Sequence, residues 1–85
     1  MRFTVTWHPR AEQQLGELWL RSPNRQQFAE AADAIDVMIA ENPLAVGESR
    51  VGIARVLFVG PLAVTYDVFE ADRRVVVLSV WLTRR

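Results

Sequence analysis

Apolar residues gather in three short runs within residues 55–82, and turn-forming residues separate these runs at Gly60-Pro61 and at Glu70-Ala71-Asp72. Runs this short and this rich in β-branched and aromatic residues are typical of β-strands. Breaks this short join neighbouring strands as antiparallel hairpins. We therefore predict an antiparallel meander of three strands. A small sheet cannot bury enough surface alone, so the first half of the chain must cover one of its faces.

The residues before residue 55 are predicted to form the elements that cover this face of the sheet. Residues 2–7 alternate between polar and apolar side chains, which indicates a half-buried strand. His8 follows as a cap or turn residue, and Pro9 suits the first turn of a helix. The apolar positions of this helix recur on one face: Ala11, Leu15, Leu18 and Trp19. Trp7 and Trp19 are expected in the core.

A second helix is predicted after a short break, with Ser22 as its cap and Pro23 at its first position. It ends at about Asn42, before Pro43. Its apolar positions follow helical spacing: Phe28, Ala31, Ala32, Ile35, Met38 and Ile39. Since the break is short, the two helices are expected to form an antiparallel hairpin.

The predicted strands each divide into two faces. In the middle strand one face carries Leu62, Val64, Tyr66 and Val68, and the other carries Ala63, Thr65, Asp67 and Phe69. In the last strand Val76, Leu78, Val80 and Leu82 oppose Val75, Val77, Ser79 and Trp81. The second set is more apolar than a solvated face should be, so we predict a partner-binding surface there, with Asp67, Ser79 and Trp81 as contact residues.

These elements predict one α+β domain over residues 1–85, in the order β-α-α-β-β-β. An antiparallel sheet would pack against an N-terminal helical hairpin. The formal net charge is zero, from ten arginines and ten acidic residues, which gives no general attraction to nucleic acid or membranes. Cysteine is absent and no apolar run approaches the ~20 residues of a membrane helix, so we expect a cytoplasmic protein with no disulfides and no contact with the membrane.

Candidate chemistry is sparse. No phosphate-binding glycine loop or metal-ligand cluster is present, so no cofactor and no metal site are predicted. The arginines near the strand ends offer two interpretations. Two basic patches, Arg50 with Arg55 and Arg84 with Arg85, could contact nucleic-acid phosphates. They could equally be solvated charges that protect the ends of strands from aggregation.

Several segments, taken in order, resemble the RelE/ParE toxins of bacterial type II toxin–antitoxin systems. The matching segments are Trp7-His8-Pro9, Ala11 with Leu15, Ala32 with Ile35-Asp36, Asn42-Pro43, Arg55-Val56-Leu57, residues 64–68 and residues 75–80. They span nearly the whole chain, and their order and spacing carry the resemblance. The family's fold agrees with the one that the residue pattern predicts.

The resemblance implies a growth-inhibiting toxin that a cognate antitoxin wraps and neutralises. It also implies that operator DNA is contacted only through the antitoxin. One branch of the family cleaves mRNA on the ribosome as a metal-independent endoribonuclease, and the other inhibits DNA gyrase. On the cleaving branch the catalytic residues would be Arg55, Arg84 and Arg85.

This chain departs from the cleaving branch at two positions. Alignment on Tyr66 places Ala63 where that branch has a catalytic arginine, and Thr83 where it has a basic residue. Cleavage requires phosphate neutralisation and proton transfer at this place. An alternative hypothesis therefore stands beside the toxin: a protein of the same fold whose catalytic site has decayed and which acts only by binding.

Overall fold

The computed structural model describes residues 2–83. Its elements run in the order β1 (Thr4–Trp7), α1 (Pro9–Arg21), α2 (Arg25–Glu41), β2 (Glu48–Ser49), β3 (Ala54–Val59), β4 (Leu62–Phe69) and β5 (Arg74–Leu82). The predicted α+β class and the predicted order of the main elements are confirmed. The two-residue strand β2 is an addition, because it lies within the segment that the sequence pattern left as a connector.

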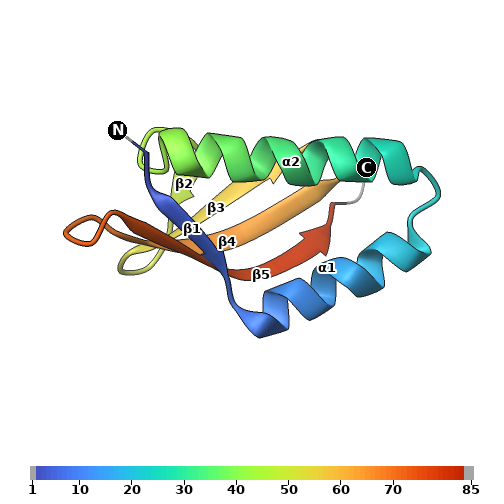
Figure 1. The fold of residues 1–85 in the computed structure, drawn as a ribbon, viewed down its shortest axis with the longest axis horizontal. Coiled ribbons are helices and arrows are strands. Elements are labelled where there is room, and N and C mark those ends of the chain that lie inside the picture. The colour runs from blue at the N-terminus through green and yellow to red at the C-terminus, as the bar shows by residue number, and fades with distance from the viewer. Residues whose placement is uncertain (1, 84–85) are drawn as a thin grey trace.

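The strands form one sheet in the order β1-β5-β4-β3-β2, and β3, β4 and β5 are the predicted antiparallel meander (Figure 1). The sheet as a whole is mixed, since β1 pairs with β5 in parallel. A parallel pair needs a long crossover connection. Both helices and the strands β2, β3 and β4 lie between β1 and β5 in the chain. The alternation within β1 carries no information about its neighbour.

Each helix begins at a side chain that caps it. The Nδ1 atom of His8 accepts a hydrogen bond from the backbone N–H of Arg10 at 3.1 Å, which confirms His8 as a cap. The second helix starts later than predicted, because Asn24 and not Ser22 is its cap. The Asn24 side-chain oxygen accepts from the N–H of Gln27 at 3.0 Å, while Ser22 ends α1.

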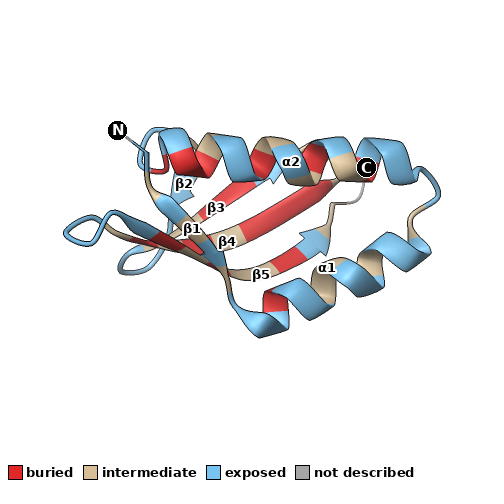
Figure 2. Cartoon of the chain, viewed as in Figure 1, coloured by how far each residue is buried: buried red, intermediate tan, exposed pale blue. Residues whose placement is uncertain are grey.

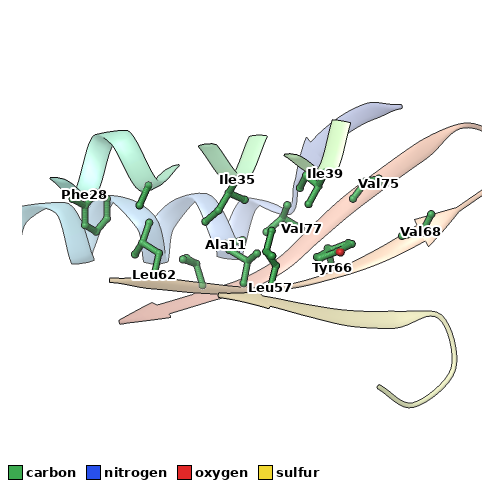
Figure 3. Packing of buried hydrophobic residues seen from close by; sticks show 13 residues of the cluster. Ala11, Phe28, Ile35, Ile39, Leu57, Leu62, Tyr66, Val68, Val75 and Val77 are labelled. Carbon is green, nitrogen blue, oxygen red and sulfur yellow. The ribbon is translucent and has the colours of Figure 1, made fainter. Parts of the chain in front are cut away.

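Both helices lie on the same side of the sheet (Figures 1 and 3). The first helix packs against β5, and the second packs against β1, β3 and β4. Buried side chains of both helices meet one face of the sheet in a single cluster (Figures 2 and 3): Ala11, Phe28, Ala31, Ile35, Ile39, Leu57, Leu62, Val64, Tyr66, Val68, Val75, Val77 and Val80. We call this the covered face, and the opposite one the open face.

A β-bulge in β5 reverses part of the predicted alternation. Thr65 pairs with Ser79 and Tyr66 pairs with Val77, so Leu78 is an extra residue without a partner in β4. Val75 and Val77, predicted on the partner-binding side, therefore lie fully buried on the covered face. Val76 moves to the open face beside Asp67. Because residues 75–78 are all apolar, hydrophobicity did not distinguish the two registers.

The distal half of β5 is protected by α1. Strand β1 pairs with β5 only as far as Val77, which leaves the backbone edge beyond it without a strand neighbour. The side-chain oxygen of Gln14 accepts a hydrogen bond from the N–H of Val80 at 3.1 Å and so satisfies one of these groups. Covering an edge in this way removes a template for unwanted strand pairing.

The two tryptophans predicted in the core differ in how far they are buried. Trp7 packs against the core cluster, and its indole N–H donates to Asp36 Oδ1 at 2.8 Å, which ties β1 to α2. Trp19 was predicted in the core but is 37% exposed. Its ring meets Phe28 edge to face, with the ring centres 5.7 Å apart. The guanidinium of Arg25 also lies over the Trp19 ring, 5.8 Å from its centre, so Phe28 and Arg25 cover the ring in part.

Tyr66 holds the segment that joins α2 to the sheet. Its ring is fully buried, and its hydroxyl lies 2.9 Å from the carbonyl oxygen of Pro43 and 3.0 Å from that of Val46. Gly47 follows with φ of +73°. A Cβ at Gly47 would lie 2.6 Å from the Val56 carbonyl oxygen and 2.8 Å from the Tyr66 hydroxyl, so both the conformation and the close approach require glycine.

We expect Gly47→Ala to lower the free energy of unfolding by roughly 2–3 kcal/mol, because it combines left-handed strain with displacement of the Tyr66 hydroxyl. The matched control is Gly16→Ala in α1, where a Cβ meets no atom within 4 Å. The control should gain about 0.5–1 kcal/mol from helix propensity. Urea denaturation followed by circular dichroism measures both, and equal stability of the two variants would contradict this account.

Candidate functional site

The open face carries an aromatic pair at one end. Phe58 of β3, Ala63 of β4 and Trp81 of β5 are direct cross-strand neighbours and so form one row across the sheet. Phe58 is 53% exposed and Trp81 38% exposed, whereas Ala63 between them is inaccessible to solvent. Exposed aromatic side chains on one face of a sheet are typical of contact residues at protein interfaces.

The next rows of the open face are polar but weakly charged. The hydroxyls of Thr65 and Ser79 form a short hydrogen bond to each other across the strands. Asp67 follows on the next row, opposite Val76. Beyond it, the guanidinium of Arg74 lies over the ring of Phe69, 5.4 Å from its centre. Arg74 is thus the arginine that the described part of β3, β4 and β5 contributes to this face.

The structure brings together the predicted contact residues Asp67, Ser79 and Trp81, which all lie on the open face. Phe58 joins them, although the sequence analysis did not select it. In the sequence, Phe58 could be found only from the alternation of side chains within β3. That alternation assigns Phe58 to the open face once its pairing with Ala63 is known. Binding of a partner to this surface stays a prediction.

Of the three predicted catalytic arginines, Arg55 lies within the described residues, while Arg84 and Arg85 lie outside them. Arg55 pairs with Tyr66 across β3 and β4, so strand alternation directs it to the covered face, away from Trp81.

Arg55 lies in a half-buried site beneath the loop that Tyr66 holds. Its Nη2 group donates to the carbonyl oxygens of Val46 and Gly47, each at 3.3 Å. Its Nε atom is buried and has no hydrogen-bond partner. The side chain also lines a cavity of about 210 Å³ with six other residues: Leu44, Ser49, Gly52, Ile53, Val68 and Glu70.

The same burial changes the acid–base behaviour of Tyr66. Burial raises the pKa of the Tyr66 hydroxyl above its ordinary value of 10.0, and the nearby Arg55 guanidinium partly opposes this increase. The neutral hydroxyl is therefore the form that the folded protein favours, and it is the form able to donate to the Pro43 and Val46 carbonyls.

A second concave surface lies between the two helices, which diverge from their short connection (Figure 1). It has a volume of about 430 Å³. Leu15, Trp19, Phe28 and Ala32 give it an apolar lining, while Glu12 and Asp33 add negative charge. Gly16 also lines it, and its missing side chain leaves open space there. We call this surface the helix groove.

Within residues 2–83, no group of three potential ligands from histidine, aspartate and glutamate is placed to hold a metal ion. None of the helices in this part of the chain is long and apolar enough to cross a membrane. The open face, the helix groove and the Arg55 cavity are the parts of the described surface considered for chemistry or binding.

No protein-family model and no curated protein matches the sequence. Among solved structures, one chain of the toxin–antitoxin complex RelBE2 from Mycobacterium tuberculosis is similar at 20% identity and a TM-score of 0.80, over 98% of this chain and 100% of that one. A chain of the chromosomal ParDE toxin–antitoxin system from Pseudomonas aeruginosa matches at 15% identity and 0.64, over 98% of each chain.

The same fold also occurs as part of a longer protein. TrmO from Pseudomonas aeruginosa matches at 21% identity and a TM-score of 0.64, over 94% of this chain but 35% of that one. At these identities the comparisons show the fold. The chain has the RelE/ParE-like α+β fold that its residue pattern indicated.

We expect Tyr66→Phe to lower the free energy of unfolding by about 1–2 kcal/mol at neutral pH, because it removes the donor to Pro43 and Val46. For the wild type, the raised pKa means a contribution that is fully present below pH 10.0 and is lost as the pH rises through the folded-state pKa. The chain has one tyrosine, no cysteine and no lysine, so no other side chain titrates strongly there. Denaturation curves at pH 8 to 11 measure this, and a variant that loses stability in parallel with the wild type would contradict it.

Proposed function

We propose that this chain is the toxin of a type II toxin–antitoxin pair, which inhibits growth in the cytoplasm until a cognate antitoxin binds it. The observation that carries this proposal is the whole-chain match to a chain of the RelBE2 complex, over 98% of this chain and 100% of that one. The independent resemblance of the sequence to RelE/ParE toxins supports the toxin role within such a pair. Operator DNA would be contacted through the antitoxin.

The composition of the open face favours action by binding. Phe58 and Trp81 offer an aromatic anchor, and large exposed aromatics often dominate the energy of an interface. Cleavage of RNA would need several cations to neutralise phosphate charge and a group to transfer a proton. In the described part of this face the single arginine is Arg74, and its guanidinium stacks on Phe69. We therefore propose a protein target, with DNA gyrase as the one the resemblance implies.

Cleavage of ribosome-bound mRNA is the second candidate, and the clustering of Arg84 and Arg85 at the end of the chain favours it. On this route Arg84 and Arg85, with Arg55, would be the catalytic residues. Arg55 could act only on a substrate that reaches its cavity from the loop side, since it points away from the open face. A protein that binds its partner without inhibiting growth is the third outcome.

The helix groove is suited to the antitoxin. Its lining is apolar, and Glu12 and Asp33 give it negative charge. By charge complementarity the proposed occupant is an amphipathic segment of the antitoxin that places aliphatic side chains in the groove and basic side chains near these two carboxylates. This arrangement leaves the open face for the cellular target.

We expect induced expression of the wild type to stop growth and co-expression of its cognate antitoxin to restore it. Trp81→Ala should raise survival on induction at least tenfold, because it removes an exposed contact residue whose loss leaves the core intact. Leu20→Ala is the matched control, since Leu20 is also exposed but lies on α1. Colony counts on inducing plates are the measurement.

Two assays on purified protein then separate the routes. Inhibition of gyrase supercoiling that Trp81→Ala weakens supports the protein-target route. Cleavage of ribosome-bound mRNA that Arg84→Ala and Arg85→Ala abolish would replace it with the nuclease route. Harmless wild-type expression in a host with both targets would contradict the toxin proposal.

We expect Gly16→Arg to weaken antitoxin binding at least tenfold, because the new side chain has open space to enter the helix groove. It should leave the growth inhibition by the toxin alone unchanged. Leu20→Arg, on the same helix but outside the groove, is the control and should bind normally. Isothermal titration calorimetry measures affinity, and normal binding by Gly16→Arg would exclude the groove as the docking site.

A further inference from the structure

Arg55 is a half-buried cation without a carboxylate partner. The ion pairs found within residues 2–83 join Arg2 to Glu41 at 3.6 Å and Arg50 to Glu48 at 3.3 Å, and neither includes Arg55. Removing a charged group from water is costly unless opposite charge or hydrogen bonds compensate it. In the described chain the groups near the Arg55 guanidinium are neutral: the carbonyl groups of Val46 and Gly47, which accept hydrogen bonds from it, and the Tyr66 hydroxyl.

The Arg55 guanidinium is held in place by one of its three nitrogen atoms. Both carbonyl oxygens accept from Nη2, which fixes the planar group from one side. The buried Nε–H has no partner. The unpaired Nε–H leaves the charge of Arg55 incompletely compensated, and because Arg55 lines the cavity, an anion in that cavity would lie against its guanidinium. A guanidinium presents its N–H groups as a fork that matches the two oxygens of a carboxylate or a phosphate.

The cavity beside Arg55 is large enough for such a ligand and has mixed walls. Its volume of about 210 Å³ corresponds to roughly seven water molecules at ~30 Å³ each. Ser49 adds a hydroxyl, whereas Leu44 and Ile53 add apolar surface that is exposed to solvent. A side chain with methylene groups below a charged end would satisfy both parts of this lining.

The walls of the cavity favour a carboxylate on a polypeptide over a phosphate. Glu70 also lines it, so the site combines one positive and one negative side chain, and a second negative charge on the ligand gains as much repulsion as attraction. The apolar surface of Leu44 and Ile53 suits a polypeptide better than a phosphate backbone.

We propose that the Arg55 cavity binds the carboxylate of an aspartate or glutamate side chain flanked by apolar residues in a protein partner. The guanidinium of Arg55 receives the carboxylate, Ser49 supplies a further donor, and the neighbouring apolar side chains of the partner cover Leu44 and Ile53. This site accepts acidic segments, whereas the helix groove with Glu12 and Asp33 favours basic ones. The inference does not depend on the toxin proposal.

The test compares two capped tripeptides, N-acetyl-Leu-Glu-Leu-amide and N-acetyl-Leu-Gln-Leu-amide, which differ only in the charged group. Each is titrated into the full chain labelled with ¹⁵N, and the Arg55 Nε–H and Ser49 amide signals are followed by NMR. We expect saturable shifts with the glutamate peptide and at least tenfold weaker binding of the glutamine peptide, since a charge-assisted hydrogen bond is lost. Inorganic phosphate at the same concentration forms a third arm and should bind less tightly than the glutamate peptide.

Three variants test which side chains bind the glutamate peptide. Arg55→Gln should weaken binding of the glutamate peptide about tenfold, and Arg74→Gln, which removes the same charge on the open face, should leave it unchanged. Glu70→Gln keeps the Arg55 contacts with the loop and removes the repelling carboxylate, so it should bind the glutamate peptide about twofold or more tightly. This opposite change keeps the test decisive if Arg55→Gln fails to fold.

Equal affinity for the two peptides would overturn the proposal. So would shifts that spare the Arg55 and Ser49 signals. Tighter binding of phosphate than of the glutamate peptide would overturn the assignment to an acidic protein segment and indicate a nucleic-acid backbone as the ligand instead.

Discussion

The burial of Tyr66 is the interaction on which much of this structure depends. Its ring occupies the middle of the covered face, and its hydroxyl reaches the carbonyls of Pro43 and Val46. The segment that leaves α2 is thereby held against the sheet, and Gly47 can make its close approach to Val56. Arg55 completes the arrangement from the neighbouring strand. The loop, the sheet edge and the Arg55 cavity thus share one set of contacts.

The placement of both helices on one side of the sheet divides the molecule into separate surfaces. One face contributes to the core, and the other keeps Phe58 and Trp81 exposed to solvent. The divergence of the helices opens the helix groove on the far side of the core. The proposed function needs one surface for a target and another for an antitoxin, and the open face and the helix groove share no residues.

The bulge at Leu78 shows how one residue redistributes these surfaces. Without it, Val75 and Val77 would face solvent and Val76 would face the helices. With it, Val80 and Val77 can both reach the covered face while Ser79 and Trp81 stay on the open face. Ser79 and Trp81, near the end of β5, therefore lie on the face predicted for them, although the same alternation was wrong at the beginning of the strand.

The sequence by itself determined the elements, the α+β class and the antiparallel meander, because helical and strand periodicities are local properties of the chain. It also identified His8 as a cap and placed Asp67, Ser79 and Trp81 on one face. The parallel pairing of β1, the position of Arg55 and the helix groove were decided by tertiary structure. Each depends on which segments become neighbours across the fold, and a cation such as Arg55 has the same local pattern whether it meets solvent or lies beneath a loop.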